Sequence, residues 1–197
     1  FCAGADLKEI AAGNAGGLAT ARGGFGGIVT RERTKPLIAA VDGHAVAGGT
    51  EIALACDLRV ASTASKFGIP EVKRSLVAAA GGLVRLPRAL PTAIAMELAV
   101  TGDTLDAERA YHFGLINDLC DAGEAVPAAL RLAERINANA PLAVRASRQL
   151  ILDAPTQTDR AGMKAAGKAM MGLSSTEDFD EGPRAFIEKR PPNWTGR

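Results

Sequence analysis

The sequence predicts an α/β fold with a parallel sheet, followed by a region made only of helices. Of the 197 residues, 47% are hydrophobic and 23% are charged, which is typical of a globular protein able to bury a core. Up to about residue 123, short apolar strand-like runs alternate with helix-like segments. Beyond that point the apolar spacing is helical only. We therefore expect a core at residues 1–123 and a helical region at residues 124–197.

The first clear strand is predicted at residues 37–41. In "KPLIAAVDG" a continuous apolar run lies between a proline and an Asp-Gly turn, as in a strand that is buried on both faces. The segment "GGTEIALACD" then predicts a short apolar helix, and "LRVAS" predicts the next strand. This order is a βαβ unit, so we expect parallel pairing. Residues 11–27, in contrast, are rich in Gly and Ala and predict a loop or a frayed helix.

A second unit repeats the rhythm of strand, turn and helix. "SKFGIPEVKRS" predicts a short strand or turn and then a polar segment, and "AAAGGLVRLPRALP" predicts a short helix closed by prolines. "TAIAMELAVTG" predicts a helix that stops at Gly102. "TLDAERAYHFG" predicts another helix, capped by Asp103 or Thr104 and ended by Gly114. "LINDLC" predicts a further buried strand.

The C-terminal part predicts helices in "EAVPAALRLAERINAN", in "PLAVRASRQLILDA" and at residues 159–173. The last segment, "STEDFDEGPRAFIEKRPPNW", predicts a capped helix with a Pro-rich tail. A helical region of this kind either mediates assembly or packs on its own core, and the sequence leaves both open.

The charge balance and hydropathy exclude several classes of partner. The 23 basic and 22 acidic side chains give a formal net charge of +1, so no overall field attracts a nucleic-acid backbone or an anionic membrane. No window approaches the roughly 20 apolar residues of a membrane helix, and no signal-peptide pattern opens the chain. We expect neither partner, and a cytoplasmic location. Because "FCAGADLKEI" lacks an initiator Met, we also expect a fragment or a processed product.

The cysteine and histidine patterns predict no metal site. Cys2, Cys56 and Cys120 are odd in number and far apart, which favours reduced thiols over a disulfide framework. His44 and His112 have no second ligand at metal spacing. The sequence also lacks the "GK[ST]" of a P-loop and the "GxSxG" elbow of a serine hydrolase.

The segment "HAVAGGTEIALACD" places one carboxylate, Glu51, just inside an apolar helix. Burial among apolar groups would raise its pKa, which suits a general acid or base near neutral pH. The alternative is a carboxylate that interacts with the dipole of its own helix. Gly48, just before it, either presents a free amide at the helix start or only permits tight packing.

Six segments, in order, resemble the enoyl-CoA hydratase/isomerase (crotonase) family. They are "FCAGADLKE", "KPLIAAVDGHAVAGGTEIALACDLRVAS", "KFGIPEV", "AAAGGLVRLPRAL", "VTGDTLDAERAYHFGLIND" and "EGPRAFIEKR", and they cover nearly the whole chain. The resemblance implies a spiral of ββα turns, followed by a helical C-terminal region used for trimer formation. It also implies that the segment forming the first spiral turns of relatives is missing before Phe1.

By this resemblance, the backbone amides of Ala5 and Gly48 form an oxyanion hole for a thioester carbonyl that becomes an enolate. Glu51 and Glu71 then act on one water molecule, with Glu51 orienting and deprotonating it and Glu71 donating a proton to the substrate. Adding water across a conjugated double bond needs both proton transfers, which two carboxyl groups can divide. Taken from its neighbours alone, Glu71 is a surface residue at a helix start after Pro70.

The resemblance also implies how CoA binds. It places the ligand near the "CAGADLK" turn, at the backbone of Ala3 and the amine of Lys8. Phe186 and Lys189 of "AFIEKR" would reach the ligand from a neighbouring subunit, although each lysine is equally explained as a solvated charge. The implied partner is an acyl-CoA substrate with no separate cofactor, because CoA is part of the substrate. The implied assembly is a homotrimer or a dimer of trimers.

The leading functional hypothesis is an enoyl-CoA hydratase, as in fatty acid β-oxidation. The alternatives are an enoyl-CoA isomerase or another acyl-CoA enzyme of the family, and a non-catalytic acyl-CoA-binding subunit. One departure concerns the loop beside Glu71, where many relatives carry Pro-Gly and this chain has Ala78, Ala79 and Ala80. This departure affects the expected acyl-chain preference.

Overall fold

The computed structural model describes residues 1–197, except for the side chain of Ala15. The chain forms two compact units, one of residues 1–33 and 37–131 and the other of residues 34–36 and 132–197. The division falls within helix α6 (Ala125–Asn137), later than the domain boundary expected at residues 123/124.

The first unit contains short strands and short helices in alternation. Its strands are β1 (Ala19–Thr20), β2 (Gly24–Phe25), β3 (Ile38–Val41), β4 (His44–Val46), β5 (Leu58–Ser62), β6 (Lys66–Gly68), β7 (Leu105–Asp106) and β8 (Asp118–Cys120). Its α-helices are α1 (Leu7–Ala11), α2 (Gly48–Ala55), α3 (Gly82–Ala89), α4 (Thr92–Thr101) and α5 (Ala107–His112), with 3₁₀ turns η1 (Ala15–Leu18) and η2 (Pro70–Arg74).

The four strands from β3 to β6 alternate between two sheets. β3, β5 and β8 form one parallel sheet, while β4 pairs with β6 in parallel and β6 pairs with β7 antiparallel in another. Two strands and then a helix make up each turn of the chain, as in β3, β4 and α2. This is the ββα arrangement that the family resemblance implies, and the parallel pairing expected between the strands of "KPLIAAVDG" and "LRVAS" is confirmed.

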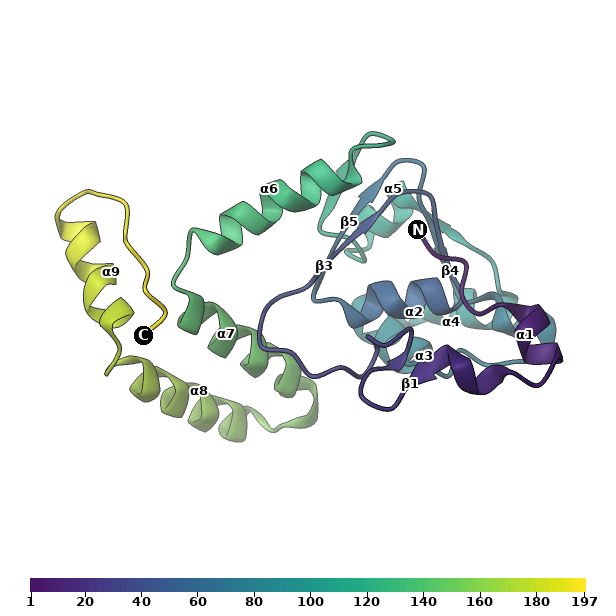
Figure 1. Ribbon diagram of the computed structural model, residues 1–197, viewed down its shortest axis with the longest axis horizontal. Helices are drawn as coiled ribbons and strands as arrows, with labels where there is room; N and C mark the ends of the chain where they lie inside the picture. The colour runs from purple at the N-terminus through teal and green to yellow at the C-terminus, as the bar shows by residue number, and fades with distance from the viewer. The chain divides into compact units, whose positions relative to one another are not determined.

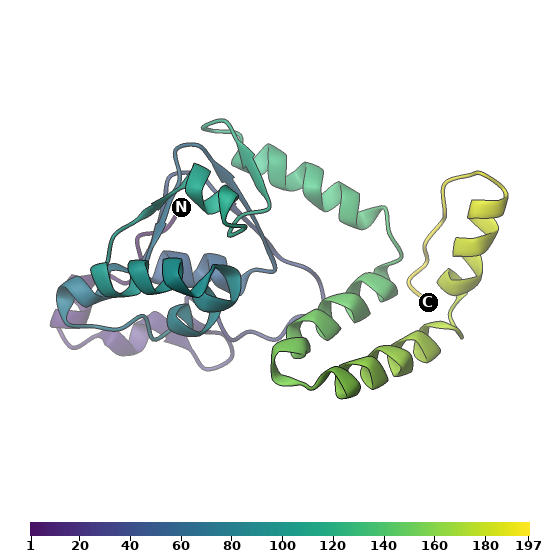
Figure 2. The same ribbon diagram turned by 180° about the vertical axis from the view of Figure 1, so that it is seen from behind.

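The core of this unit lies between the strands and helices α2, α3 and α4. Val41, Ala53, Phe67, Leu86 and Leu98 are all nearly inaccessible to solvent and belong to one apolar cluster. Figure 1 shows α2 running below the strands, with α3 and α4 beyond it, and Figure 2 shows α4 and α5 in teal from the other side. Burial of these side chains is the main stabilising term of the unit.

Several local predictions were wrong. The helix of residues 107–112 is capped by Asp106, whose carboxylate accepts the N–H of Arg109 at 2.8 Å, and not by Asp103 or Thr104. Leu105 and Asp106 form a short strand first, which moves the helix start. β8 is only partly buried, because it lies at the edge of its sheet.

Two further short elements were not predicted. β4 follows β3 after a two-residue turn, and its first residue is exposed. Its three residues are too few to form an apolar pattern that predicts a strand. Residues 11–27, expected to be a loop or a frayed helix, contain η1 and the hairpin of β1 and β2. Pairs of two-residue strands are held mainly by their surroundings and lack a sequence pattern of their own.

The first residues of the chain run beside β4. The N–H of Cys2 donates to the carbonyl of His44 at 2.9 Å, and the N–H of Val46 donates to the carbonyl of Cys2 at 3.1 Å. The chain then turns at Gly4, whose φ of 93° is in the left-handed region, and enters α1 through the cap Asp6. This path brings the segment of residues 2–5 against the start of α2.

The second unit is helical, as predicted. It contains the last part of α6, α7 (Pro141–Asp153), η3 (Ala154–Thr156), α8 (Asp159–Leu173) and α9 (Glu177–Ile187). The hydroxyl of Thr176 accepts the N–H of Phe179 and so caps α9. The tail returns to this helix, since the amide of Thr195 donates to buried Asp178 at 2.7 Å. Among the described residues, no helix combines the length and apolar character needed to cross a membrane.

Thr50 fixes the start of α2 to the strands. Its side chain is 1% exposed, accepts the N–H of Gly68 at 3.0 Å, and has the carbonyls of Ala45 and Gly68 within 2.5 and 2.8 Å as acceptors for its hydroxyl proton. One residue therefore joins α2, β4 and β6 in the interior, where an unpaired polar group is costly.

We expect Thr50→Val to lower the free energy of unfolding by about 1–3 kcal/mol, because the buried N–H of Gly68 loses its acceptor while the side-chain volume is conserved. Urea denaturation followed by circular dichroism measures this change. Thr63→Val, at an exposed position, is the matched control and should unfold like the wild type. Equal midpoints for both variants would contradict the role given to Thr50.

Candidate active site

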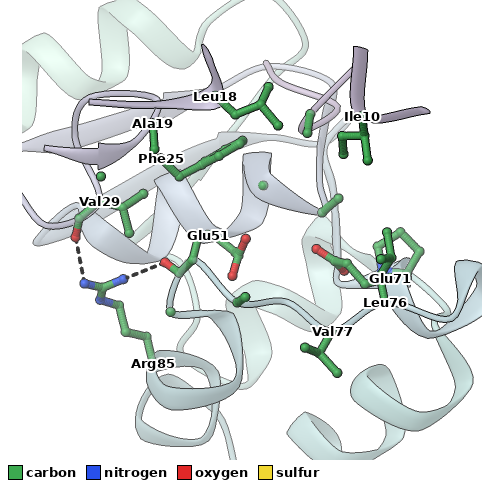
Figure 3. Close-up of a pocket in the computed structure, with 18 of the residues that line it drawn as sticks. Ile10, Leu18, Ala19, Phe25, Val29, Glu51, Glu71, Leu76, Val77 and Arg85 are labelled. Atoms are coloured by element: carbon green, nitrogen blue, oxygen red, sulfur yellow. Dashed lines mark hydrogen bonds between the residues drawn. The ribbon is translucent and has the colours of Figure 1, made fainter. Parts of the chain in front are cut away.

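A pocket of about 930 Å³ lies entirely within the first unit. Its wall comes from the N-terminal segment, the Gly-rich segment of β1 and β2, the start of α2, and the stretch from η2 to α3 (Figure 3). Most of the lining side chains are apolar, and the carboxylates of Glu51 and Glu71 are exceptions. A large apolar pocket with a few convergent polar groups is the usual form of a small-molecule site.

The amides of Ala5 and Gly48 belong to two backbone segments that touch. A β-carbon on Gly4 would lie 2.9 Å from the nitrogen of Gly48, so only a glycine permits this approach. Gly48 is the first residue of α2, where backbone N–H groups have no partner inside the helix. Among the described residues, neither amide donates a hydrogen bond within the chain, and both residues line the pocket.

Gly48 is also required for space. A β-carbon at this position would lie 2.4 Å from two atoms of the Phe25 ring, which therefore lies directly over the glycine. Phe25 comes from β2 and lines the pocket above Glu51 (Figure 3). Phe25 was not predicted from the sequence, although an aromatic side chain within "GGFGG" was the available signal.

Glu51 is 4% exposed, as the sequence predicted. Its Oε1 accepts the N–H of Gly82 at 2.8 Å, so the carboxylate meets the first residue of α3. Burial raises the pKa of Glu51, while the amides of Gly82 and Ala80 and the charge of Arg85 act in the opposite direction. The alternative for Glu51 was an interaction with the N-terminus of its own helix, α2. The structure shows such an interaction with the N-terminus of α3 instead.

Glu71 is the second residue of η2 and follows Pro70, which suits the first position of a helical turn. The side chain is half-buried, and its buried Oε2 has no hydrogen-bond partner among the described residues. Burial raises the pKa of Glu71, its own backbone N–H acts in the opposite direction, and the negative charge of Glu51 raises the pKa further. Figure 3 shows its carboxylate directed toward that of Glu51.

Together these groups can carry out acid–base chemistry beside a stabilised anion. Two backbone donors at a helix start stabilise negative charge that develops on a substrate oxygen. Two carboxyl groups with raised pKa values accept and release protons nearer neutral pH than ordinary carboxyl groups do. The buried Oε2 of Glu71, which has no partner among the described residues, can form a hydrogen bond with a ligand.

The predicted CoA-binding residues have different locations. Ala3 lines the pocket, whereas Lys8 is exposed on α1 and does not contribute to the lining. Phe186 and Lys189 belong to the second unit, where both side chains are exposed. Phe186 is 85% exposed, which is unusual for a phenylalanine. Their contact with a ligand stays a prediction.

Basic residues of the pocket wall were also missed by the sequence analysis. Lys73, Arg74, Arg85 and Arg88 contribute to the lining. Their signal in the sequence was the pair Lys73-Arg74 after Glu71 and the two arginines after Gly81-Gly82, but such residues are common on solvated helix faces. No group of three or more His, Cys, Asp or Glu side chains among the described residues is placed to hold a metal ion.

Comparison with known proteins identifies the family of this chain. The profile described as "Enoyl-CoA hydratase/isomerase" matches residues 1–197. The chain belongs to this family, the crotonase family. It is 41% identical over 203 residues to "Enoyl-CoA hydratase EchA19" of Mycobacterium tuberculosis, and 40% identical over 197 residues to "(E)-benzylidenesuccinyl-CoA hydratase" of Thauera aromatica. Both alignments cover the whole of this chain, and they cover 76% and 77% of the length of the two relatives.

A solved crotonase-family structure confirms the fold. The crystal structure of an enoyl-CoA hydratase from Mycobacterium tuberculosis is 51% identical and superimposes with a TM-score of 0.95, covering all of this chain and 77% of the other. Membership of the family, with relatives named as hydratases, makes this chain a hydratase-type enzyme. Whether a preceding segment exists stays a prediction.

We expect the free energy of unfolding of Glu71→Gln, relative to the wild type, to rise with pH above 4.5. Below this ordinary carboxyl pKa, Glu71 is protonated in both the folded and the unfolded wild type. As the pH rises, the unfolded state loses the proton first, so the wild type loses stability until the higher folded-state pKa is passed. Glutamine does not titrate, so the variant does not lose stability in this way.

Urea denaturation at a series of values between about pH 4 and about pH 8 measures this difference. Glu108→Gln, at an exposed position in α5, is the control and should follow the wild type throughout. A difference for Glu71→Gln that does not change with pH would refute the raised pKa of Glu71.

Proposed function

We propose that this enzyme is an enoyl-CoA hydratase that adds water across the 2,3 double bond of a 2-enoyl-CoA thioester. The observation that carries the proposal is the pair of carboxylates, Glu51 and Glu71, that line one pocket with the unused amides of Ala5 and Gly48. An isomerase needs acid–base chemistry at the same enolate, but it does not add a water molecule.

The proposed reaction begins with the thioester oxygen bound by the amides of Ala5 and Gly48. The water oxygen attacks C3 while Glu51 accepts a proton from the water, and the electrons of the double bond move toward the thioester carbonyl. The resulting enolate is stabilised by the two amides, each of which contributes about 3 kcal/mol in comparable oxyanion holes. Glu71 then donates a proton to C2, which restores the carbonyl and completes the hydration.

The surroundings of the two carboxylates support this division of roles. Glu51 must be ionised to accept a proton. Burial raises its pKa, but the amides of Gly82 and Ala80 and the charge of Arg85 favour its ionised form. Glu71 must carry a proton, and both its burial and the negative charge of Glu51 favour the protonated form. Pairs of carboxyl groups whose environments differ in this way commonly serve as base and acid. Because the two groups can share protons, the pair is the firmer part of the proposal.

The pocket wall beside Glu71 does not specify the length of the substrate's acyl chain. Ala79 and Ala80 line the pocket together with Leu76, Val77 and Val84, so this wall combines small and larger apolar side chains. Ala78 is instead buried, and a β-carbon on Gly82 would meet its methyl group at 2.9 Å. The alanines that replace Pro-Gly thus shape both the loop and the wall.

The remaining assignments extend the same proposal. We infer that CoA lies along the segment of Ala3 and Lys8, and that Phe186 and Lys189 contact it from a neighbouring subunit of a homotrimer or a dimer of trimers. Hydration of this kind supplies a 3-hydroxyacyl-CoA, as in fatty acid β-oxidation. No separate cofactor takes part in the proposed reaction.

We expect Glu71→Gln to lower kcat for the hydration of crotonyl-CoA by about 10²- to 10⁴-fold, because the amide cannot donate the carboxyl proton. The affinity for a saturated acyl-CoA, measured by calorimetry, should change little, since glutamine conserves the shape. The double variant Glu51→Gln/Glu71→Gln should lose less than the product of the two single losses if both groups act on one water molecule.

The test also separates the alternatives. Glu108→Gln, at an exposed position in α5, should retain the wild-type rate. Wild-type protein that moves the double bond of a 3-enoyl-CoA but does not hydrate crotonyl-CoA would favour the isomerase. Protein that binds acyl-CoA and turns over neither substrate would be a binding subunit.

A further inference from the structure

Arg85 joins two loops of the pocket wall. Its Nη2 donates to the carbonyl of Val29 at 2.8 Å, and its Nη1 donates to the carbonyl of Ala80 at 3.2 Å (Figure 3). The side chain is half-buried and comes from the first turn of α3. A planar guanidinium holds two acceptors in a fixed geometry, which a lysine cannot do.

The loop held by Arg85 is the one that contacts Glu51. Ala80 lies two residues before Gly82, whose N–H donates to Glu51 Oε1 at 2.8 Å. Gly81, between them, has a φ of 105°, and a β-carbon there would lie 2.1 Å from Nη1 of Arg85. The conformation of this loop is therefore adapted to the arginine on one side and to the carboxylate on the other.

The charged groups around Glu51 have opposite effects on its ionisation. Glu71, from η2, is the neighbouring acidic group, and Arg85, from α3, is the basic group that attracts the ionised carboxylate. The positive charges of Arg33 and Arg88 act on Arg85 and lower its pKa. If the Arg85 charge were lost, only the amides of Gly82 and Ala80 would oppose the effect of burial, so the pKa of Glu51 would rise further.

We propose that Arg85 is a positioning residue of the hydration reaction, which fixes the loop of residues 80–82 so that the carboxylate of Glu51 faces the attacking water. Its charge also favours the ionised form of that carboxylate, which the reaction requires. This role rests on the proposed function of Glu51 as the base. Arg85 acts through Glu51 and need not touch the substrate.

The test compares Arg85→Gln, Arg85→Lys and the control Arg109→Gln, which removes an equal charge at a distant ion pair with Glu97. We expect Arg85→Gln to lower kcat at least about tenfold and to move the acid limb of the kcat/KM profile to higher pH. Arg85→Lys retains the charge, so its acid limb should stay near that of the wild type while kcat falls, because one carbonyl loses its donor. Arg109→Gln should match the wild type in both.

An unchanged acid limb in Arg85→Gln, with or without a loss of kcat, would overturn the proposal, because a merely structural residue lowers the rate alone. If Arg85→Gln does not fold, an Arg85→Lys variant with the wild-type kcat would overturn it equally.

A readout without activity separates this proposal from the proposed function. In protein labelled with ¹³C at the glutamate carboxyl, the Glu51 signal is assigned by its loss in Glu51→Gln and is titrated in the wild type and in Arg85→Gln. A higher pKa of Glu51 in Arg85→Gln supports the coupling even if no 2-enoyl-CoA is hydrated, whereas an unchanged pKa refutes it.

Discussion

The site depends on the close contact between the backbone of residues 2–5 and the start of α2. A β-carbon on Gly49 would lie 2.0 Å from the carbonyl oxygen of Cys2, and one on Gly4 would lie 2.9 Å from the nitrogen of Gly48. The hydrogen bonds of Cys2 to β4 hold the first segment at this distance. Two residues from separate parts of the chain therefore line one pocket with their free amides.

This contact also explains the amino acids at 48 and 49. Neither glycine has a positive φ, so the backbone conformation does not require a missing side chain. Space requires it instead, because Phe25 lies on one of them and Cys2 on the other. A glycine in the first turn of a helix costs some stability relative to alanine, and the close packing around the pair offsets that cost.

The sequence predicted the elements with strong local patterns and missed those that depend on contacts. The strand of residues 38–41 and the helix from Gly48 were found because apolar spacing reports them. The predicted burial of this strand on both faces was wrong, since only the alternate residues Ala39 and Val41 are buried. β4, β7 and the hairpin of β1 and β2 have two or three residues each, and pairing with distant strands decides them.

The same distinction applies to the site. Burial of Glu51 followed from its apolar neighbours in the sequence, and Ala5, Gly48 and Glu71 came from the resemblance to a family. Arg85 and Phe25 reach the pocket through tertiary contacts with Val29, Ala80 and Gly48, which no spacing rule reports. The amide that meets Glu51 likewise belongs to the neighbouring helix, 31 residues away.

The pocket collects the starts of three helical segments, and this arrangement governs the charges within it. α2 begins at Gly48, η2 begins at Pro70 and α3 begins at Gly82, and the first residues of α2 and η2 line the pocket while the amide of Gly82 meets Glu51. Helix N-termini favour negative charge, which suits both an enolate oxygen and one ionised carboxylate.

The same field would also favour the ionised form of Glu71, whereas the proposed mechanism requires Glu71 as a proton donor. The negative charge of Glu51 opposes that effect, and Oε2 of Glu71 has no donor among the described residues to stabilise an ionised carboxylate. The two glutamates are therefore distinguished by their partners rather than by their type. The amide of Gly82 at the start of α3 and the charge of Arg85 favour the ionised form of Glu51. Glu71 has only its own backbone N–H to oppose burial and the negative charge of Glu51, so the proposed acid lies beside the proposed base.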